Sequence, residues 1–542
     1  MRFDWSNPYR TLRTPVFARN VVATSHPLAA QAGLRMLFEG GNAVDAAIAA
    51  AAMLTVAEPV SNGLGSDAFA ILWDGEALHG LNASGPAPAA WTPEFFRRRH
   101  GQDERGLAVI PTLGWDTVTV PGAVAGWQAL HERFGLLPLA RLLEPAISAA
   151  ERGLAVAPVV ADKWARAASV MKNFPGWAQT FLPRGRPPSV GEKFVFPGAA
   201  RLLRLLAENG LREFYDGRVA ERLGAWAQKT GGALTAGDMN GYRPEWVTPL
   251  SMEYRGYELH EIPPNGQGIA ALMALGVLKH FDLASLAPDS AQSQHLQIEA
   301  MKLAFADIRR YVGEPRTMAV RPEMMLDPDY LAARAKSIDP ARASFPGPGA
   351  FPQGGTVYLT AADEKGMMIS YIQSNYIGFG SGIVEPDYGI SLQNRGRAFS
   401  ADPNSPNVVA PGKRPFHTII PAFLTQNGKA RMSFGVMGAD VQPQGHIQTL
   451  IRMLDYRQQP QAACDAPRFK VNMDFSVNIE SRADPALAQA LADMGHTIHI
   501  DDVYHGASGS GQFIWRLAGD DDTDAGYVAA SDSRRDGCAC GF

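Results

Sequence analysis

The chain has 542 residues, of which 46 % are hydrophobic and only 19 % are charged. This low charged fraction indicates a large buried interior and excludes a disordered or coiled-coil chain. Because 50 Lys and Arg residues nearly balance 54 Asp and Glu residues, with a formal net charge of −4, the charge favours neither nucleic acid nor an anionic membrane as the main partner, and we expect a small ligand.

The cysteines and the N-terminus predict the compartment. Three cysteines, two of them at positions 538 and 540, cannot form a disulfide framework. The basic N-terminal segment is not followed by the run of about 7 to 15 apolar residues that a secretory signal requires. HExxH, paired CxxC, Walker A and GxSxG motifs are absent from the sequence. We therefore expect a cytoplasmic protein that uses no metal and no cofactor.

The first half of the chain predicts mainly helices. A helix over 28–38 is stopped by two glycines, and Asn42 can cap the alanine-rich segment 43–57. That segment is shorter than the roughly 20 residues of a membrane span, so we expect a core helix. Pro121 opens another helix, and apolar residues at helical spacing predict a further core helix over 295–313.

The pattern changes after an exposed connector at 344–355, which holds four glycines and three prolines. Alternating apolar residues then predict a hairpin of strands 356–362 and 367–376. The remaining predicted elements are strands at 417–425 and 430–438, a helix at 443–454, and a strand pair at 511–517 and 526–531. The second part of the chain is therefore led by strands.

The junction of Gly355 with Thr356 offers a specific chemistry. A threonine hydroxyl is a poor nucleophile without a base, and an N-terminal threonine carries one in its own α-amine. Two glycines before Thr356 would permit the backbone geometry in which its hydroxyl attacks the Gly355 carbonyl. Taken alone, the same residues also fit an ordinary loop that enters a strand.

Longer motifs resemble one known family in order and over nearly the whole chain. Four of these segments are GGNAVDAAIAAAAMLTVAEPVSNGLGSDAF, VPGAVAGWQ, KRPFHTIIP and GVMGAD. They resemble motifs of the gamma-glutamyltranspeptidase family of N-terminal-nucleophile hydrolases. The resemblance implies an α+β fold, the four-layer αββα sandwich. It also implies one inactive precursor cleaved between Gly355 and Thr356 into a large subunit, 1–355, and a small subunit, 356–542. Both subunits would stay in one intertwined fold, with a homodimer of such pairs as a further expectation.

The resemblance also implies the reacting groups. Thr356 would be the nucleophile and its freed amine the general base. Ser374 stands where the family has a supporting threonine, and a hairpin that places 356 opposite roughly 373 brings Ser374 within reach, although a strand hydroxyl facing solvent is the alternative. The backbone N–H groups of Gly438 and Ala439 match the family's oxyanion hole. The alanine keeps the N–H but narrows the allowed backbone.

The family's γ-glutamyl pocket is not kept. Its acid, Asn and Gln fall on Ala398, Tyr376 and Arg395, and its serine pair falls on His417 and Thr418. A substrate ammonium beside Arg395 would be repelled, whereas a carboxylate would pair with it. We therefore expect an amide with a carboxylate and no α-amino group. Arg395 could instead form a structural ion pair, and His417 could either orient the substrate or fill the core.

These observations lead to three hypotheses. The first is a self-cleaving amidohydrolase on a small carboxylate-bearing amide such as oxamate, with hydrolysis favoured over transfer. QNRG at 393–396 resembles the branch that includes oxamate amidohydrolase and some cephalosporin acylases. The second is a γ-glutamyl hydrolase or transferase acting on glutathione-like substrates. The third is a pseudoenzyme that keeps the fold as a binding module and never cleaves.

Overall fold

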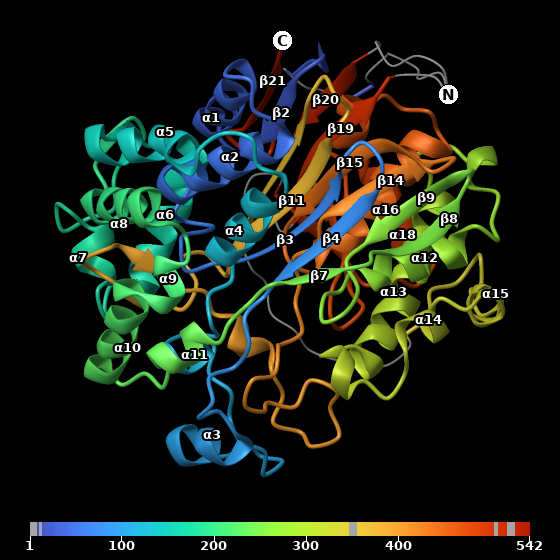
Figure 1. The fold of residues 1–542 in the computed structure, drawn as a ribbon. Coiled ribbons are helices and arrows are strands. Elements are labelled where there is room, and N and C mark those ends of the chain that lie inside the picture. Colours follow the sequence, from blue (N-terminus) through green and yellow to red (C-terminus); the bar gives the residue numbers. More distant parts are fainter. Residues whose placement is uncertain (1–7, 10–12, 346–354, 503–507, 518–525) are drawn as a thin grey trace.

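Two seven-stranded antiparallel sheets form the centre of the computed structural model, which describes residues 8–9, 13–345, 355–502, 508–517 and 526–542 (Figure 1). Sheet A contains, in spatial order, β21 (Cys538–Gly541), β2 (Val21–Thr24), β10 (Gly355–Ala362), β11 (Met368–Tyr376), β3 (Asp67–Trp73), β4 (Leu78–Ala83) and β7 (Glu245–Val247). Sheet B contains β1 (Val16–Ala18), β20 (Tyr527–Ser531), β19 (Ser510–Arg516), β15 (Lys429–Met437), β14 (Ala422–Gln426), β9 (Tyr257–Glu261) and β8 (Leu250–Tyr254).

An apolar core lies between the two sheets. On β10, Tyr358 and Ala362 belong to this core, whereas Val357 and Leu359 pack into the core on the other face of sheet A. Side chains alternate along a strand, so this pattern assigns one face of β10 to the space between the sheets. Thr356 shares the Tyr358 face and therefore looks into that space.

Helices cover the outer face of each sheet (Figure 1). Sheet A is covered by α1 (Pro27–Phe38), α2 (Ala43–Ala57), α4 (Ala123–Phe134) and α5 (Leu139–Arg152), and sheet B by α12 (Ile269–Leu278), α13 (Ala291–Tyr311) and α16 (Val441–Leu454). The order helix, sheet, sheet, helix is the four-layer αββα sandwich that the family resemblance implied. That prediction of the fold is confirmed.

The remaining helices and short strands lie around these layers. They are α3 (Pro93–His100), α6 (Pro158–Met171), α7 (Trp177–Phe181), α8 (Pro197–Asn209), α9 (Glu213–Asp216), α10 (Arg218–Thr230), α11 (Ala236–Asn240), α14 (Pro322–Met325), α15 (Pro328–Lys336), α17 (Pro460–Asp465), α18 (Pro485–Asp493), β5 (Leu154–Ala155), β6 (Lys193–Phe194), β12 (Val384–Glu385), β13 (Ile390–Ser391), β16 (Phe469–Val471), β17 (Val477–Glu480) and β18 (Ile498–Asp501).

The predicted core helices are present, with boundaries set by their caps. Every residue of α2 is buried, and Asn42 and Asp45 form a reciprocal capping box at its start. The Asp45 charge is thereby satisfied inside the core. Helix α13 begins four residues before the predicted start at 295, because Ser290 caps it by accepting a hydrogen bond from the Ser293 N–H.

The strand predicted over 417–425 is wrong in its first half. Strand β14 begins only at Ala422. Before it, the His417 N–H donates to the Asn265 carbonyl, the Ile420 N–H donates to the Gln442 side chain, and Pro421 has no N–H to donate. These contacts take the donors that a strand ladder would need. In this irregular segment, the His417 side chain contacts Asp67 and the Thr418 hydroxyl accepts from Arg395.

The predicted hairpin forms, but its register differs by one residue from the expectation. Val357, not Thr356, lies opposite Gln373, and Gly355 lies opposite Tyr376, with a bulge between Gly355 and Val357. The extra residue on β11 moves Thr356 toward Ser374. The predicted connector lies mostly outside the described residues, because 346–354 are not described.

Strands from both sides of the Gly355–Thr356 junction alternate within each sheet. In sheet A, β10 and β11 lie between β2 on one side and β3 on the other, although β2 and β3 precede the junction by about three hundred residues. In sheet B, four later strands lie between β1 and β9. Neither part of the chain can therefore form either sheet without the other.

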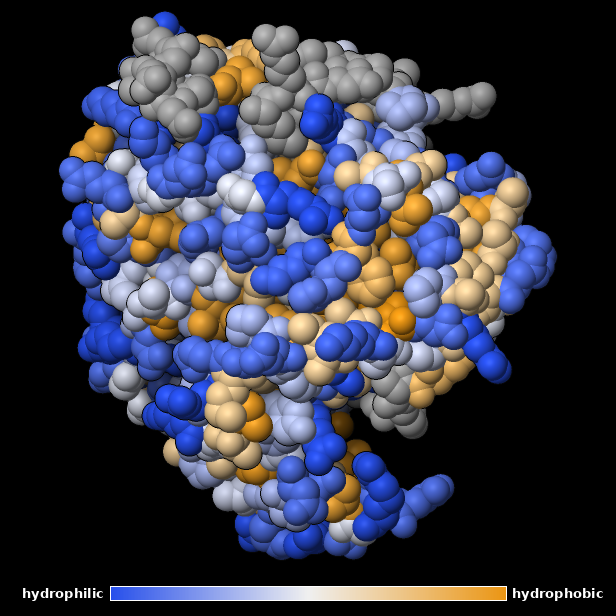
Figure 2. All heavy atoms as spheres, turned by 90° about the vertical axis from the view of Figure 1, so that its right-hand side faces the viewer, coloured by the Kyte–Doolittle hydropathy of each residue, from blue (hydrophilic) through white to orange (hydrophobic). Residues whose placement is uncertain are grey.

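A small lobe projects below the sandwich, at the end that carries α3 (Figures 1 and 2). Its separate core contains Trp91, Phe96, Phe399 and Val409. Figure 2 shows hydrophilic side chains with smaller hydrophobic patches between them on the adjacent face of the molecule. Within the described residues, no helix is both long enough and apolar enough to cross a bilayer.

Candidate active site

The Thr356 hydroxyl is held at the start of β10. Thr356 is 3 % exposed, and its Oγ1 donates to the Oγ of Ser374 over 3.3 Å. The same Ser374 oxygen accepts a hydrogen bond of 2.8 Å from the Tyr376 N–H. Ser374 is fully buried, so the alternative that its hydroxyl faces solvent is wrong. The bulge thus places two hydroxyl groups side by side in the space between the sheets.

A strained turn follows β15. Gly438 has φ +128° and Ala439 has φ +54°, and α16 starts two residues later. A left-handed conformation costs a non-glycine residue about 1–2 kcal/mol, and such residues concentrate at functional sites. Among the described residues, none accepts a hydrogen bond from the N–H of Gly438 or Ala439. Two adjacent donors of this kind are suited to hold an oxyanion.

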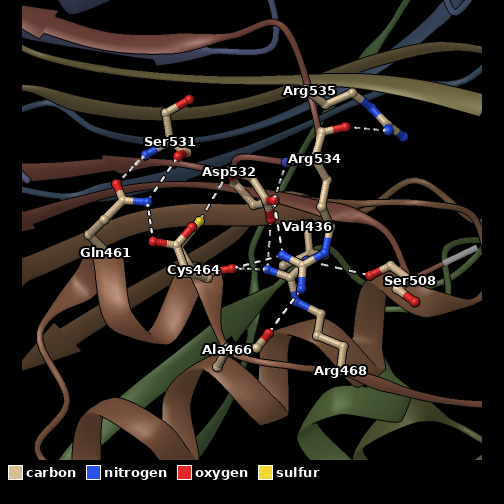
Figure 3. A network of polar contacts seen from close by, with 12 residues as sticks. Val436, Gln461, Cys464, Ala466, Arg468, Ser508, Ser531, Asp532, Arg534 and Arg535 are labelled. Carbon is tan, nitrogen blue, oxygen red and sulfur yellow. Dashed lines mark hydrogen bonds and ion pairs between the residues drawn. The ribbon is translucent and has the colours of Figure 1, made fainter. Parts of the chain in front are cut away.

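A buried ion network fixes the backbone behind this turn (Figure 3). Arg468 and Arg534 both contact the Asp532 carboxylate, over 2.9 and 3.0 Å, and Asp532 also accepts from the Gly511 N–H over 2.8 Å. Although burial opposes ionisation, the two guanidinium groups hold the pKa of Asp532 well below its usual range. The segment fixed in this way includes Gly509, whose Cα lies 2.9 Å from where a Cβ on Gly438 would sit.

Arg395 is the most unusual group beside this region. It is fully buried, it donates from Nη1 to the Thr418 Oγ1 over 2.9 Å, and its Cζ lies 4.4 Å from the centre of the Tyr376 ring. Its Nε and Nη2 have no acceptor among the described residues. Tyr376 itself has φ +79°, a rare conformation for an aromatic residue. The structure therefore brings Arg395, Thr418 and Tyr376 together, with two buried donors left over.

His417 contacts an acid that the sequence analysis did not single out. Its Nε2 lies 3.2 Å from the Asp67 Oδ2, and its ring packs edge-on against Phe69 with the ring centres 4.7 Å apart. Burial, and then the nearby Arg395 charge, lower the pKa of His417 well below its usual value. His417 therefore both fills the core and orients a buried carboxylate.

Gln267 connects Thr418 with the turn at Gly438 and Ala439. Its Nε2 donates to the carbonyl of Thr418 over 2.6 Å and to that of Ala439 over 2.8 Å. A continuous set of contacts thus runs from the turn at Gly438 and Ala439 through Thr418 to Arg395. Tyr376 and Ser374 continue it to Thr356.

Two polar residues of this site escaped the sequence analysis. They are Asp67 and Gln267, whereas the position expected for a family acid, Ala398, offers no carboxylate. Ala398 is buried in a short 3-10 helix, Arg395–Ala398, and carries no polar group. The sequence does contain a signal for Asp67. A charged residue at the start of the apolar strand DAFAILW requires a polar or charged partner when it is buried.

A family model and two curated proteins match nearly the whole chain. A family model described as gamma-glutamyltranspeptidase matches residues 29–542. An oxamate amidohydrolase proenzyme of Klebsiella pneumoniae is 35 % identical over 539 residues, which cover 97 % of this chain and 99 % of that protein. A glutathione hydrolase-like proenzyme, YwrD, of Bacillus subtilis is 34 % identical over 538 residues, covering 98 % and 100 %.

Solved structures agree with the sequence relatives. A crystal structure described as a cephalosporin acylase from Bacillus halodurans is 47 % identical, with a TM-score of 0.92, and covers 100 % of this chain and 99 % of that one. Similarity of this extent includes both sheets and the helices outside them. Common ancestry with these proteins therefore explains both the fold and the order of the motifs.

Proposed function

Because the chain belongs to the gamma-glutamyltranspeptidase family, we propose that this enzyme is made as a precursor that cuts itself between Gly355 and Thr356. The mature form then hydrolyses a small amide that carries a carboxylate, such as oxamate. Residues 1–355 become the large subunit and residues 356–542 the small subunit. The alternation of their strands supports a mature form in which the two subunits stay together.

The self-cleavage is an acyl shift followed by hydrolysis. The Thr356 Oγ1 attacks the Gly355 carbonyl carbon, the Gly355–Thr356 C–N bond breaks, and an ester forms in its place. Water then hydrolyses that ester, which releases the Gly355 carboxylate and restores the hydroxyl. The product is an N-terminal Thr356 whose α-amine can act as a base, with an ordinary pKa of about 7.7–8.0.

Each later turnover uses that amine. It takes the proton of the Thr356 hydroxyl as the oxygen attacks the substrate amide carbon, and the N–H groups of Gly438 and Ala439 stabilise the oxyanion by about 3 kcal/mol each. The leaving nitrogen takes the proton and departs as ammonia or an amine. Water then attacks the acyl-enzyme and releases the acid product.

The observation that carries this substrate class is the buried guanidinium of Arg395. Two of its donors lack an acceptor among the described residues, and leaving buried charged donors unpaired is costly. A substrate carboxylate can accept from Nε and Nη2 together in the bidentate geometry that guanidinium favours. The same charge repels the α-ammonium of a γ-glutamyl group, which is why we favour oxamate-like amides over glutathione.

Two measurements test this function. A denaturing gel of purified wild-type protein should show two bands, and Thr356→Ala should leave one band at 58.4 kDa. Ammonia release from oxamate and from glutaryl amides is then compared with turnover of γ-glutamyl p-nitroanilide. A single full-length band from an active wild type contradicts self-cleavage. Faster turnover of the γ-glutamyl compound contradicts the assigned substrate class.

A further inference from the structure

Asp67 lies on the same face of sheet A as the hydroxyl groups of Thr356 and Ser374. Its Cα is the register partner of Ser374 across β3 and β11, and Ser374 in turn bonds to Thr356 on β10. Directly opposed residues of an antiparallel pair project from the same face of a sheet. Three neighbouring strands of sheet A thus present a carboxylate and two hydroxyls to the same space between the sheets, beside the proposed pocket.

Among the described residues, three groups contact the Asp67 carboxylate. Its Oδ1 accepts from the N–H of Gly85 over 3.3 Å and from that of Gly122 over 3.1 Å, and its Oδ2 lies 3.2 Å from the His417 Nε2. The His417 Nδ1 accepts from the Ile419 N–H over 3.4 Å. This contact leaves the ring proton on Nε2, so neutral His417 donates to Asp67.

Two positive charges face Asp67, and the other titratable groups around it are uncharged. Arg395 and Arg414 attract its negative charge, His417 is neutral, and the phenols of Tyr215 and Tyr242 are buried and un-ionised. Arg414 is already paired with Glu245 over 2.7 Å. In the free enzyme, ionised Asp67 therefore balances the charge of Arg395.

We propose that Asp67 takes up one proton from solvent when a carboxylate-bearing substrate binds at Arg395. This inference rests on the proposed function. A substrate carboxylate on the free donors of Arg395 would otherwise place two buried anions against one buried cation, which a low-dielectric site opposes. When Asp67 is protonated, one carboxylate again faces one guanidinium. The affinity for anionic substrates should therefore be higher at neutral pH than at alkaline pH.

The ionisation of Asp67 supports this coupling. Burial raises the pKa of Asp67 to about 7, and the attraction of Arg395 is the largest effect that opposes the rise. A bound carboxylate neutralises Arg395, which removes that opposition and raises the pKa of Asp67 further. Above about pH 7 the free enzyme must gain a proton to bind an anion, so the affinity should fall tenfold for each further pH unit.

The test compares oxamate with oxamide, a neutral molecule of nearly the same shape. Any titration of the Thr356 amine affects both substrates, so it cancels in the ratio of their kcat/KM values. For the mature wild type, the ratio of oxamate to oxamide should fall tenfold per unit between pH 7.5 and 9. In Asp67→Asn, this ratio should be flat, and KM for oxamate at pH 9 should be lower than in the wild type.

A matched control uses another partly buried aspartate that pairs with an arginine away from the site. Asp307 lies 2.8 Å from Arg334, between α13 and α15, so Asp307→Asn should keep the wild-type ratio at every pH. A second measurement needs no variant. Calorimetry of propionate binding to the mature wild type at pH 8.5, in two buffers of different ionisation enthalpy, should show close to one proton taken up per propionate.

The outcomes separate the two proposals. Oxamate turnover with the same alkaline profile as oxamide, or propionate binding without proton uptake, overturns the role of Asp67 and leaves the proposed function standing. If neither oxamate nor propionate binds, the assignment of Arg395 fails, and the coupling falls with it.

Discussion

Tyr376 shows how much of the site depends on single residues. Two guanidinium groups contact its ring, with the Cζ of Arg395 4.4 Å and the Cζ of Arg397 5.5 Å from the ring centre. Its left-handed backbone turns that ring toward Arg395, while its N–H reaches back to Ser374. Cations attract the faces of aromatic rings, and the attraction grows when both are removed from water. The Tyr376 backbone thus couples the position of Arg395, the proposed substrate anchor, to that of Thr356, the proposed nucleophile.

Replacing Arg395 should affect binding of anions above all. Arg395→Ala removes the paired donors, and truncating one partner of a buried charge pair costs about 2–5 kcal/mol, so kcat/KM for oxamate should fall by at least about 30-fold. Most of the change should appear in KM. Steady-state kinetics with oxamate and oxamide check this, with the exposed Arg243→Ala as the control. Unchanged KM and kcat would remove Arg395 from the site.

The oxyanion turn makes a separate prediction at Ala439. Its φ of +54° suits glycine, is tolerable for alanine and is strongly unfavourable for a β-branched residue. Ala439→Gly should keep the wild-type kcat. Ala439→Val should displace one N–H donor and lower kcat by up to about 100-fold with little change in KM. If both variants behave alike in kinetics with a saturating amide substrate, Ala439 does not contribute to the oxyanion hole.

Residues near the nucleophile were within reach of sequence reasoning, and their distant partners were not. Thr356 and Ser374 belong to one hairpin, so short-range pairing rules could relate them. Asp67 is held by groups from positions 85, 122 and 417, which no local pattern connects. The roles of the site residues as a whole stay predictions until they are tested by substitution.

At the scale of elements, a buried relay joins α13 to the loop before β18. Lys302 donates to Glu299 over 2.9 Å, to the Ser344 carbonyl over 2.9 Å and to the His496 Nδ1 over 3.1 Å. The His496 Nε2 then lies 2.8 Å from the His295 Nδ1. The atoms that could bind a metal ion here are engaged with one another and with Lys302. These contacts hold Ser344, the first residue of the connector, against the loop that carries His496.

This relay predicts a loss of stability in acid. Burial, and then Lys302 and His295, lower the pKa of His496 to about 3, below the ordinary value of about 6.5. The unfolded chain therefore binds this proton first, so the contribution of His496 is complete above pH 6.5 and declines as the pH falls toward 3. The loss is at most about 1.4 kcal/mol per pH unit.

The corresponding measurement is the thermal midpoint between pH 7 and 5. His496→Gln should start from a lower midpoint at pH 7 and lose less of it on acidification than the wild type. The exposed His499, on the adjacent β18, provides the control variant His499→Gln, which should keep the wild-type slope. Equal slopes for all three proteins would contradict the assigned role of His496.

The elements themselves were largely predictable where local signals agreed. Helix α2 has a cap and a mainly apolar run, and the strands of the hairpin β10–β11 are two apolar segments joined by a short polar turn, so both were found. The errors arose from long-range contacts. The contacts of His417 and Ile420 ended a strand that the apolar pattern favoured, and a bulge at Thr356 changed a register that turn arithmetic could give only to within one residue.

At the scale of the whole molecule, the alternation of strands predicts the behaviour of the cut protein. Because each sheet mixes strands from both sides of the junction, separating the subunits would break both sheets and the core between them. The mature protein should therefore unfold in one transition when followed by circular dichroism and by tryptophan fluorescence. Two resolved transitions, or subunits that separate under native conditions, would contradict this expectation.

The central place of β10 has one further consequence. The strand that carries the new N-terminus is flanked by earlier strands, so it enters the sandwich while the polypeptide is still continuous and its neighbours are forming. The proposed cut between Gly355 and Thr356 then removes the covalent link that brings the two parts of the chain together. Separated and denatured subunits would have to find each other before the sheets could form, whereas the precursor folds as one continuous chain. We therefore expect the denatured mature protein to refold poorly.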